Sequence, residues 1–287
     1  MQTDNTAILL IRCADREGLI SAITAQLSRL GANILYLDQH VDREHAHFYM
    51  RVEWSLNDFS ISLDDFRVIF LHEVANKYNL SWEIHERAKR ERMAIFVSRY
   101  THCYFDLLSR WKAGELPVDI PLVISNHEDL REETEGFGIT FMHVPVSKKS
   151  RIEAAEEHLR LLSEHEIDFV VLARYMQIVH PRVIDNYTDA IINIHHSFLP
   201  SFPGAKPYHQ AYERGVKIIG ATAHYVTEEL DAGPIIDQDV ERVDHKFCVA
   251  DFVRIGQDVE RKVLSRAVQN HIDKKVISHN NRTVVFS

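Results

Sequence analysis

The amino-acid sequence predicts a two-domain α/β protein, in which a small ferredoxin-like domain of order βαββαβ precedes a larger Rossmann-like domain with a mostly parallel sheet. Two observations support this prediction. In the first part of the chain, β-rich runs alternate with two stretches of apolar residues at helical spacing. From Met93 onward, short continuous apolar runs alternate with longer amphipathic stretches, which is typical of parallel strands covered by helices on both faces.

The first domain is expected to comprise residues 1–86. Leu19, Ile23 and Leu27 recur at helical spacing, and we expect Asp15 to cap this helix and Gly31 to end it. A charged stretch between two β-rich runs predicts a hairpin turn. The expected elements, in chain order, are a strand at 7–11, a helix from 19 to 30, strands at 33–41 and 46–54, a helix at 66–78 and a strand at 80–84.

A charged segment without large apolar side chains, residues 87–92, follows this domain. Such a basic cluster can bind anions or nucleic acid. Its position between two folded-looking blocks favours an exposed, solvated linker instead.

The second domain is expected to comprise residues 93–287. Its alternation of strands and helices predicts the parallel sheet, although a fold alone does not assign a function. The expected strands lie at 94–97, 120–124, 140–144, 169–172, 190–195, 216–227, 235–243 and 283–286, and the expected helices at 103–111, 152–165 and 250–272.

The candidate active site lies in the segment from Ile191 to Gln238. Side chains alternate along a strand, so Asn193 and His195 point the same way at the carboxyl end, where open α/β sheets place their sites. Asp231 follows the next β-rich run, on a turn. An amide that donates to an oxyanion, an imidazole that moves a proton and a carboxylate that holds the imidazole or a water suit acyl chemistry on a small carbonyl. No Ser or Cys nucleophile accompanies them, so direct attack by water or an amine is the simplest mechanism.

Each of these residues also has an ordinary structural interpretation. Asn-x-His at a strand end is often a capping or turn pair, and an Asp before Ala-Gly-Pro is often a turn former. The combination of all three with His224 in the second strand, and with an irregular Pro/Gly loop between the strands, favours the functional interpretation.

Composition excludes several other classes of protein. The formal net charge of −9 argues against broad nucleic-acid binding, which needs a basic face. No apolar run has the length of a membrane span and the N-terminus lacks a signal-peptide pattern, so we expect a cytoplasmic protein. Cys13, Cys103 and Cys248 are expected to be small buried thiols without a disulfide framework. The 18 histidines show no HExxH or comparable spacing, and no metal site is predicted.

Two long segments carry a resemblance to a known family. NIHHSFLPSFPGAKPYHQA and GATAHYVTEELDAGPII resemble the active-site region of the formyl transferases and hydrolases that use formyltetrahydrofolate. The resemblance implies that Asn193, His195 and Asp231 are the catalytic trio. His-His after Asn-Ile, and GAKPYH after the loop, are most similar to the hydrolysing members. This implies hydrolysis of 10-formyltetrahydrofolate to formate and tetrahydrofolate in one-carbon metabolism and purine biosynthesis, with folate as substrate and no cofactor.

One segment departs from part of that family. In the members that formylate a phosphorylated amine, the first strand of the domain runs into a glycine-rich loop that cradles the phosphate. Here the corresponding segment, Ser98 to Cys103, has no glycine. The departure favours water over a phosphate-bearing acceptor.

The resemblance also implies a folate pocket. The segment from Leu172 to Val179 matches the one that lines the pteridine pocket, with Gln177 where the transferases often carry Arg. Arg174 and Lys206 are candidate partners for the folate glutamate. In the absence of a ligand, a Met and aromatic cluster is ordinary core and exposed cations are solvated charges. The expected substrate-binding residues are Arg174, Tyr175, Met176, Gln177, Ile178, Val179, Lys206 and His224.

The first domain resembles an ACT domain, through DREGL between the first strand and helix and GANI after that helix. Such domains commonly bind an amino acid or pair with a second copy. The resemblance implies a small amino-acid effector at a loop that includes Asp15, Gly18, Leu19 and Ile20, and a homo-oligomer, either a dimer or a tetramer. Alternatively, the loop is only a turn and the domain only an assembly surface.

Two other functions remain open from the sequence. The protein could transfer the formyl group to an amine acceptor, which an acceptor-dependent rate would reveal. It could instead be a folate or amino-acid sensor that has lost catalysis, which the intact trio argues against.

Overall fold

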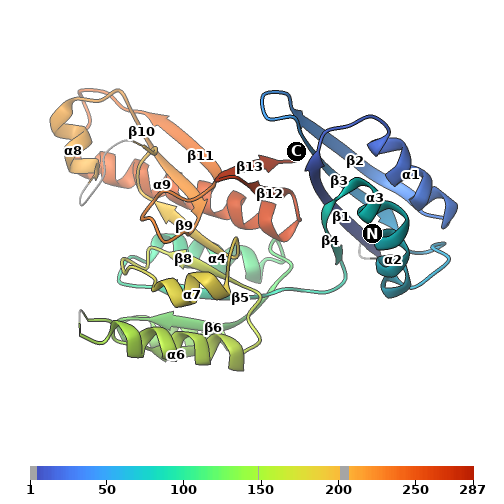
Figure 1. Cartoon of the computed structure of the whole chain (residues 1–287). Coiled ribbons are helices and arrows are strands. Elements are labelled where there is room, and N and C mark those ends of the chain that lie inside the picture. Colours follow the sequence, from blue (N-terminus) through green and yellow to red (C-terminus); the bar gives the residue numbers. More distant parts are fainter. Residues whose placement is uncertain (1–4, 148, 201–206) are drawn as a thin grey trace. The chain divides into compact units, whose positions relative to one another are not determined.

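The computed structural model describes residues 5–147, 149–200 and 207–287, and it divides into two compact units (Figure 1). Unit 1 contains the described residues up to Arg90 together with Asp273–His279 and Val284–Ser287. Unit 2 contains Glu91–Ile272 and Asn280–Thr283. Most of the C-terminal segment, which we had expected to belong to the second domain, is therefore grouped with unit 1.

Unit 1 is built on a four-stranded antiparallel sheet of order β2-β3-β1-β4, which confirms the ferredoxin-like fold. Buried apolar residues of the sheet and of the helices form one core, which includes Leu9, Trp54, Phe66 and Phe70. The elements of this part are β1 (Thr6–Ala14), α1 (Leu19–Arg29), β2 (Asn33–Asp42), β3 (His47–Ser55), α2 (Leu63–Phe70), the π-helix η1 (Leu71–Ala75), α3 (Asn76–Tyr78) and β4 (Ser81–Glu86).

Two local expectations for unit 1 were wrong. The residue that precedes α1 is Gly18, with φ of 86°, and no side chain caps the helix, so Asp15 does not have the expected role. The backbone N–H of Asp15 instead donates to Ala46 O, at 2.8 Å. The second helix begins earlier than expected, because the Ser62 side chain accepts a hydrogen bond from the backbone N–H of Asp65.

A C-terminal hairpin covers part of the other face of this sheet. It consists of β12 (Val276–His279) and β13 (Arg282–Val285), joined by two residues with positive φ, Asn280 and Asn281. Positive φ at both turn residues is the geometry of a tight hairpin turn. Ile277 and Phe286 pack in a buried cluster with residues of β1 and β3, namely Ile8, Leu10 and Tyr49. The expected last strand is present, whereas its partner β12 was not predicted.

Unit 2 is built on a seven-stranded sheet of order β11-β10-β9-β8-β5-β6-β7. The strands from β9 to β7 in this order are parallel, and β10 and β11 are antiparallel additions at one edge. The mostly parallel sheet is confirmed. The strands are β5 (Arg92–Val97), β6 (Asp119–Ser125), β7 (Thr140–His143), β8 (Phe169–Ala173), β9 (Ile191–His195), β10 (Ile218–Tyr225) and β11 (Ile235–Arg242).

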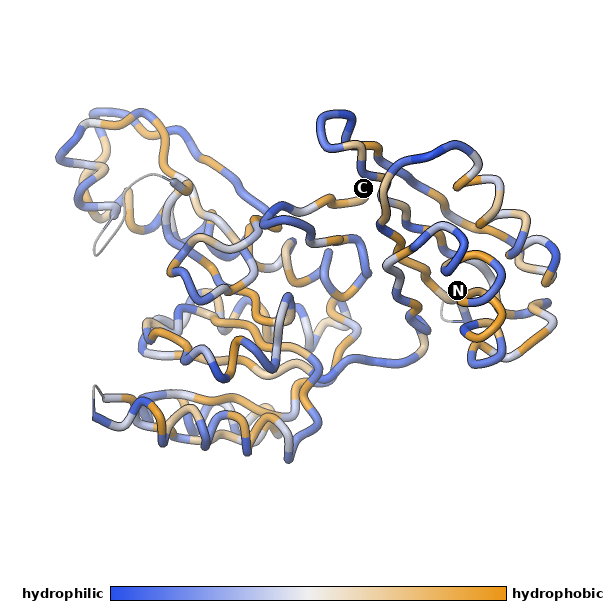
Figure 2. The backbone as a smooth tube through the Cα atoms, viewed as in Figure 1, coloured by the Kyte–Doolittle hydropathy of each residue, from blue (hydrophilic) through white to orange (hydrophobic). Residues whose placement is uncertain are grey.

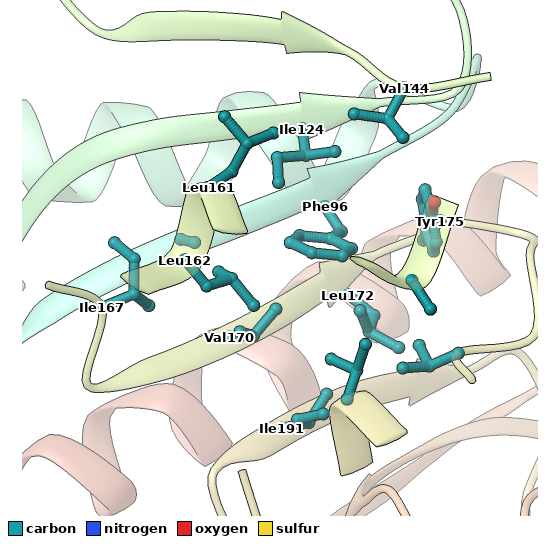
Figure 3. Packing of buried hydrophobic residues seen from close by; sticks show 14 of the residues in the cluster. Phe96, Ile124, Val144, Leu161, Leu162, Ile167, Val170, Leu172, Tyr175 and Ile191 are labelled. Atoms are coloured by element: carbon teal, nitrogen blue, oxygen red, sulfur yellow. The ribbon is translucent and has the colours of Figure 1, made fainter. Parts of the chain in front are cut away.

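Helices cover both faces of this sheet. Phe96 and Leu172 point into a core that includes residues of α6, as Figure 3 shows, whereas their buried neighbours Ile95 and Val171 lie outside that cluster. On the other side, α9 contacts β9, β10, β11 and α4. Figure 2 shows hydrophobic and hydrophilic residues alternating along α6, as expected for a helix with one buried side. The helices are α4 (His102–Lys112), α5 (Arg131–Gly136), α6 (Arg151–Glu164), α7 (Pro181–Asn186), α8 (Pro207–Arg214) and α9 (Val249–Ile272).

Three short helices, α5, α7 and α8, were not predicted from the sequence. The expectation for the cysteines holds for Cys13 and Cys103, which are buried and free, and was wrong for Cys248, which is free and exposed. Within the described ranges, no helix is long and apolar enough to span a membrane.

Candidate active site

The antiparallel junction of β9 and β10 brings two polar residues face to face. In the strand register Asn193 lies opposite His224, and Asn193 Nδ2 is 3.2 Å from His224 Nε2. His224 Nδ1 lies 2.8 Å from the backbone oxygen of Tyr225, which can only accept a hydrogen bond. In the neutral tautomer that donates to this oxygen, Nε2 accepts one N–H of the Asn193 amide. The second N–H of that amide remains available to a reactant.

Asp231 enters this site from the loop between β10 and β11. Its Oδ2 lies 3.2 Å from His195 Nδ1, and its Oδ1 lies 3.7 Å from His224 Nε2. The hydrogen bond from His195, with a smaller influence of the nearby His224 ring, holds the pKa of the Asp231 carboxyl well below its ordinary value. The expected trio therefore comes together with His224, with an ionised carboxylate between two imidazoles.

The position of Asp231 depends on a tightly built loop. Asp231 has a φ of 55°, which is uncommon for a residue other than glycine. At Gly233 a Cβ atom would lie 1.9 Å from the backbone oxygen of Tyr225, so only glycine fits this close approach. The Tyr225 N–H donates to Pro234 O at 2.9 Å and closes the loop. The sequence Asp-Ala-Gly-Pro thus builds a turn that also presents a carboxylate.

The two ring nitrogens of His195 differ in their contacts with the rest of the described chain. Its side chain is 7% exposed and its Nδ1 faces Asp231. Among the described residues, its buried Nε2 has no hydrogen-bond partner. Nearly all buried polar groups find such a partner, so an unpaired Nε2 beside Asn193 is suited to exchange a proton with a bound reactant.

His196, which sequence reasoning did not single out as a site residue, stacks on His195. The two ring centroids are 5.1 Å apart with an interplanar angle of 25°. Burial, together with the nearby charge of Arg174, lowers the pKa of His196 to about 3. A neutral His196 ring therefore packs against the His195 imidazole at neutral pH.

Behind His196 lies a buried polar cluster centred on Glu260 of α9, which is 1% exposed. Tyr208 OH donates to Glu260 Oε1 at 2.5 Å, His102 Nε2 lies 2.8 Å from Oε2, and Arg174 Nε lies 3.4 Å from Oε2. Burial raises the pKa of Glu260, but the hydrogen bond from His102 and the charge of Arg174 outweigh it and leave the pKa lowered. The buried negative charge of Glu260 is thus balanced by hydrogen bonds and positive charge from neighbouring side chains of the protein.

The same cluster is the one group of described residues with spacing suited to a metal ion. Ligand atoms of His102, Cys103 and Glu260 lie within 4.8 Å of one another. Burial raises the pKa of the Cys103 thiol well above its ordinary value, which disfavours the thiolate that binds metals. The Arg174 guanidinium also opposes a cation there. The group fits an internal ion-pair cluster better than a metal centre.

The residues expected to bind substrate separate into two groups. Arg174, Tyr175 and Val179 are buried, with Arg174 in the Glu260 cluster and its guanidinium 4.8 Å from the ring centroid of Tyr100. Met176 and Ile178 are more than half exposed, and Gln177 is partly exposed. A cavity of about 70 Å³ is lined in part by Tyr175, Ile178 and Val179. Lys206 lies outside the described residues.

The expected effector loop of unit 1 is mostly exposed. Asp15, Gly18 and Ile20 are exposed, whereas Leu19 is buried in the core. The uncapped start of α1 follows directly, so backbone N–H groups of its first turn face this loop.

Comparison with known proteins places these features in a family. A formyl transferase family model matches residues 91–268. The chain is 46% identical over 282 residues to the formyltetrahydrofolate deformylase of Synechocystis sp., covering 98% of this chain and 99% of that protein.

Two solved structures show how far the likeness extends. A formyltetrahydrofolate deformylase from Pseudomonas syringae pv. tomato has a TM-score of 0.96 and 47% identity, covering 98% of this chain and 94% of the other. A glycinamide ribonucleotide transformylase from Symbiobacterium toebii has a TM-score of 0.64 and 27% identity, covering 69% of this chain and 95% of the other. The deformylase therefore matches nearly the whole chain, and the transformylase only part of it.

Proposed function

The chain belongs to the formyl transferase family, and from this premise we propose that it hydrolyses 10-formyltetrahydrofolate to formate and tetrahydrofolate. The observation that carries the proposal concerns His195, which lies on the same strand as Asn193. Its Nδ1 faces Asp231, and its buried Nε2 has no partner in the part of the chain that the structure describes. The full-length relatives that are named for this activity support the same conclusion.

In the proposed mechanism a water oxygen attacks the formyl carbon. The carbonyl electron pair moves onto the formyl oxygen, where the free N–H of Asn193 donates to the developing negative charge. The proton released by water passes to the His195–Asp231 pair. The electron pair on the formyl oxygen then re-forms the carbonyl as the C–N10 bond breaks, and N10 takes a proton from that pair. Formic acid leaves and loses its acidic proton to solvent as formate.

Each side chain has a defined role in this mechanism. Asp231 accepts from His195 Nδ1 and so aims Nε2 at the reactant, and its lowered pKa keeps it ionised while it does so. His224 orients the Asn193 amide, because its Nε2 accepts a hydrogen bond from one N–H of that amide. Neither role needs a cofactor. The exposed Met176 and Ile178 and the partly exposed Gln177 are proposed to contact the folate, on the side of the segment that faces solvent.

An amine-directed transferase is the second candidate, because a glycinamide ribonucleotide transformylase shares the fold. The loop after β5 argues against a phosphorylated amine as the acceptor of the formyl group. Ser98 Oγ donates to Asn126 Oδ1 at 2.5 Å and also contacts the backbone oxygen of Tyr175, so a side chain lies where a glycine-rich loop would expose backbone amides. This loop therefore favours water over a phosphorylated amine as the acceptor of the formyl group.

For unit 1 we propose an assembly and effector role of the ACT type in a cytoplasmic homo-oligomer. The edge strand β2 carries exposed apolar side chains, Leu35 and Leu37, at 56% and 37% exposure. An edge strand of this kind is suited to pair with a second copy. An amino acid is proposed to bind at the loop of Asp15, Gly18, Leu19 and Ile20.

The experiment that tests the function measures formate released from 10-formyltetrahydrofolate by the purified protein without an amine acceptor. We expect release by the wild type and its loss in His195→Ala. His165→Ala, at the C-terminal end of α6, is the control and should leave the rate unchanged. A wild-type rate that required an added amine would overturn the hydrolase in favour of the transferase.

A further inference from the structure

The residues next to Asp231 make few contacts within the loop, although the bond from Tyr225 N–H to Pro234 O closes its base. Leu230 is 67% exposed, and the Ala232 N–H reaches Glu229 O only at 3.4 Å. Asp231 itself has the left-handed backbone conformation, which Asp tolerates better than most residues do. Contacts from another part of the chain therefore add to the contact with His195 in fixing the carboxylate.

The turn of the C-terminal hairpin provides those contacts. Asn281 Nδ2 donates to the backbone oxygen of Ala232 at 2.8 Å, and Thr283 Oγ1 donates to the backbone oxygen of Ile235. The two accepting residues lie on either side of Gly233-Pro234, and Ala232 directly follows Asp231. Asn281, Thr283 and the loop all belong to unit 2.

The backbone of the turn aims the Asn281 amide at the loop. Asn280 and Asn281 have φ of 50° and 59°, and the strands on either side pair with each other. Asparagine tolerates this conformation better than most residues, and its side chain supplies an N–H donor that glycine lacks. An amide is therefore held opposite the Ala232 carbonyl.

We propose that Asn281 is a positioning residue for Asp231 in the hydrolysis reaction. By holding the Ala232 carbonyl, it fixes the peptide that follows Asp231 and keeps Oδ2 within reach of His195 Nδ1. Small displacements of a reacting group are costly, since about 1 Å of misplacement can reduce a rate on the order of 10²-fold. The inference rests on the proposed function, because Asn281 acts on the reaction only through Asp231.

The test compares Asn281→Asp with a matched control in the same turn, Asn280→Gly. Asp keeps the shape and tolerates the positive φ, but an ionised carboxylate has no proton to donate to Ala232 O. The side chain of Asn280 has no hydrogen bond in the part of the chain that the structure describes, and glycine suits its conformation. Asn281→Gly removes the donor without adding a charge.

We expect kcat for formate release to fall about 3- to 10-fold in Asn281→Asp and Asn281→Gly, which is the range for losing one hydrogen bond. KM for the folate and the melting temperature should stay near wild type, and Asn280→Gly should keep wild-type kcat. Hydrogen exchange at the backbone N–H groups of residues 225–232 should be faster in both Asn281 variants.

Equal kcat and equal exchange in the Asn281 variants and the control would overturn the proposal. A rise in KM with unchanged kcat would also overturn it, since it would place Asn281 in substrate binding. If the wild type released no formate, the proposed function would fail, and the exchange comparison would then decide separately whether Asn281 holds this loop.

Discussion

Asn193 and His224 face each other across two antiparallel strands, with Asn193 Nδ2 3.2 Å from His224 Nε2. The imidazole fixes the amide in one orientation, so in the proposed mechanism the amide needs no reorganisation when charge develops on the formyl oxygen. Preorganised donors of this kind supply much of the rate enhancement in acyl chemistry.

Replacing Asn193 by Ala should therefore lower kcat by about 10²- to 10³-fold, the usual effect of removing one oxyanion donor. KM should change little, because the donor acts mainly in the transition state. Steady-state formate release measures both constants. Asn186→Ala is a suitable control, since its side chain bonds the backbone of its own helix, at Arg182 O. Equal losses in the two variants would contradict the assignment.

Asp231→Asn should lower kcat by about 10²-fold or more and change the pH–rate profile, because an amide cannot hold His195 as the carboxylate does. In the wild type the pKa of Asp231 lies well below its ordinary value, so Asp231 should stay ionised throughout mildly acidic conditions. The pH–rate profiles of the wild type and the variant, recorded side by side, test the coupling. An unchanged profile would show that Asp231 and His195 do not act as a pair.

His158 should make the fold less stable in mild acid. Burial lowers its pKa to about 4 from an ordinary value near 6.5, so the unfolded chain binds its proton at a higher pH than the folded chain. Its contribution to stability is complete above pH ~6.5 and decreases as the pH falls toward ~4, by up to about 3 kcal/mol.

Urea unfolding of the wild type and of His158→Gln at several pH values measures this effect. Gln carries no titrating proton, so the variant should lose less stability between pH ~6.5 and ~4. Its stability at neutral pH should be somewhat lower, since Tyr175 OH loses its contact with His158 Nε2 at 3.4 Å. Parallel pH dependences in the two proteins would rule out His158 as the source.

Glu260→Gln should destabilise the protein by about 3–5 kcal/mol, because it leaves the buried Arg174 and His102 without their carboxylate. Urea unfolding at neutral pH measures the change. Glu164→Gln removes an exposed partner of Arg160 on α6 and should have a far smaller effect. A Glu260→Gln variant as stable as this control would mean that the buried charges are satisfied in another way.

Gly256→Ala should loosen the packing of α8 on α9. An added Cβ would lie 2.1 Å from Tyr208 Cζ, so the ring would have to leave its place over the helix and its hydrogen bond to Glu260. Overpacking of this kind costs about 1–3 kcal/mol. Gly136→Ala is the matched control, since among the described residues beyond its own helical turn no atom lies within 4 Å of its added Cβ. Equal thermal stability of the two variants would contradict the expected clash.

Much of the fold could be predicted because its signals are local. Runs such as Phe169–Ala173 are continuous and apolar, and they form strands buried on both faces. Asn193 and His195 could be paired from the alternation along a single strand, and Asp231 from the turn that follows the next one. These inferences needed no information about distant partners.

The Glu260 cluster could not be predicted in the same way. In the sequence, Glu260 resembles any other polar residue of a long amphipathic helix. Its partners His102, Arg174 and Tyr208 come from segments that are far from it in the chain. Arg174 was expected to bind the folate glutamate, or otherwise to be a solvated charge, for that reason. Helices α5, α7 and α8 are too short to show a clear period, and β12 has only one fully buried residue, Ile277.

The C-terminal hairpin has a consequence for how the chain comes apart. Unit 1 is assembled from both ends of the sequence, because Ile277 and Phe286 complete a buried cluster with Ile8, Leu10 and Tyr49. A protease that cuts once within residues 87–92 would produce two fragments on a denaturing gel. Under native conditions the N-terminal fragment would still hold the tail of the other, so the nicked protein would elute as one particle. Expressing residues 93–287 alone would leave Ile277 and Phe286 exposed to water and prone to aggregation.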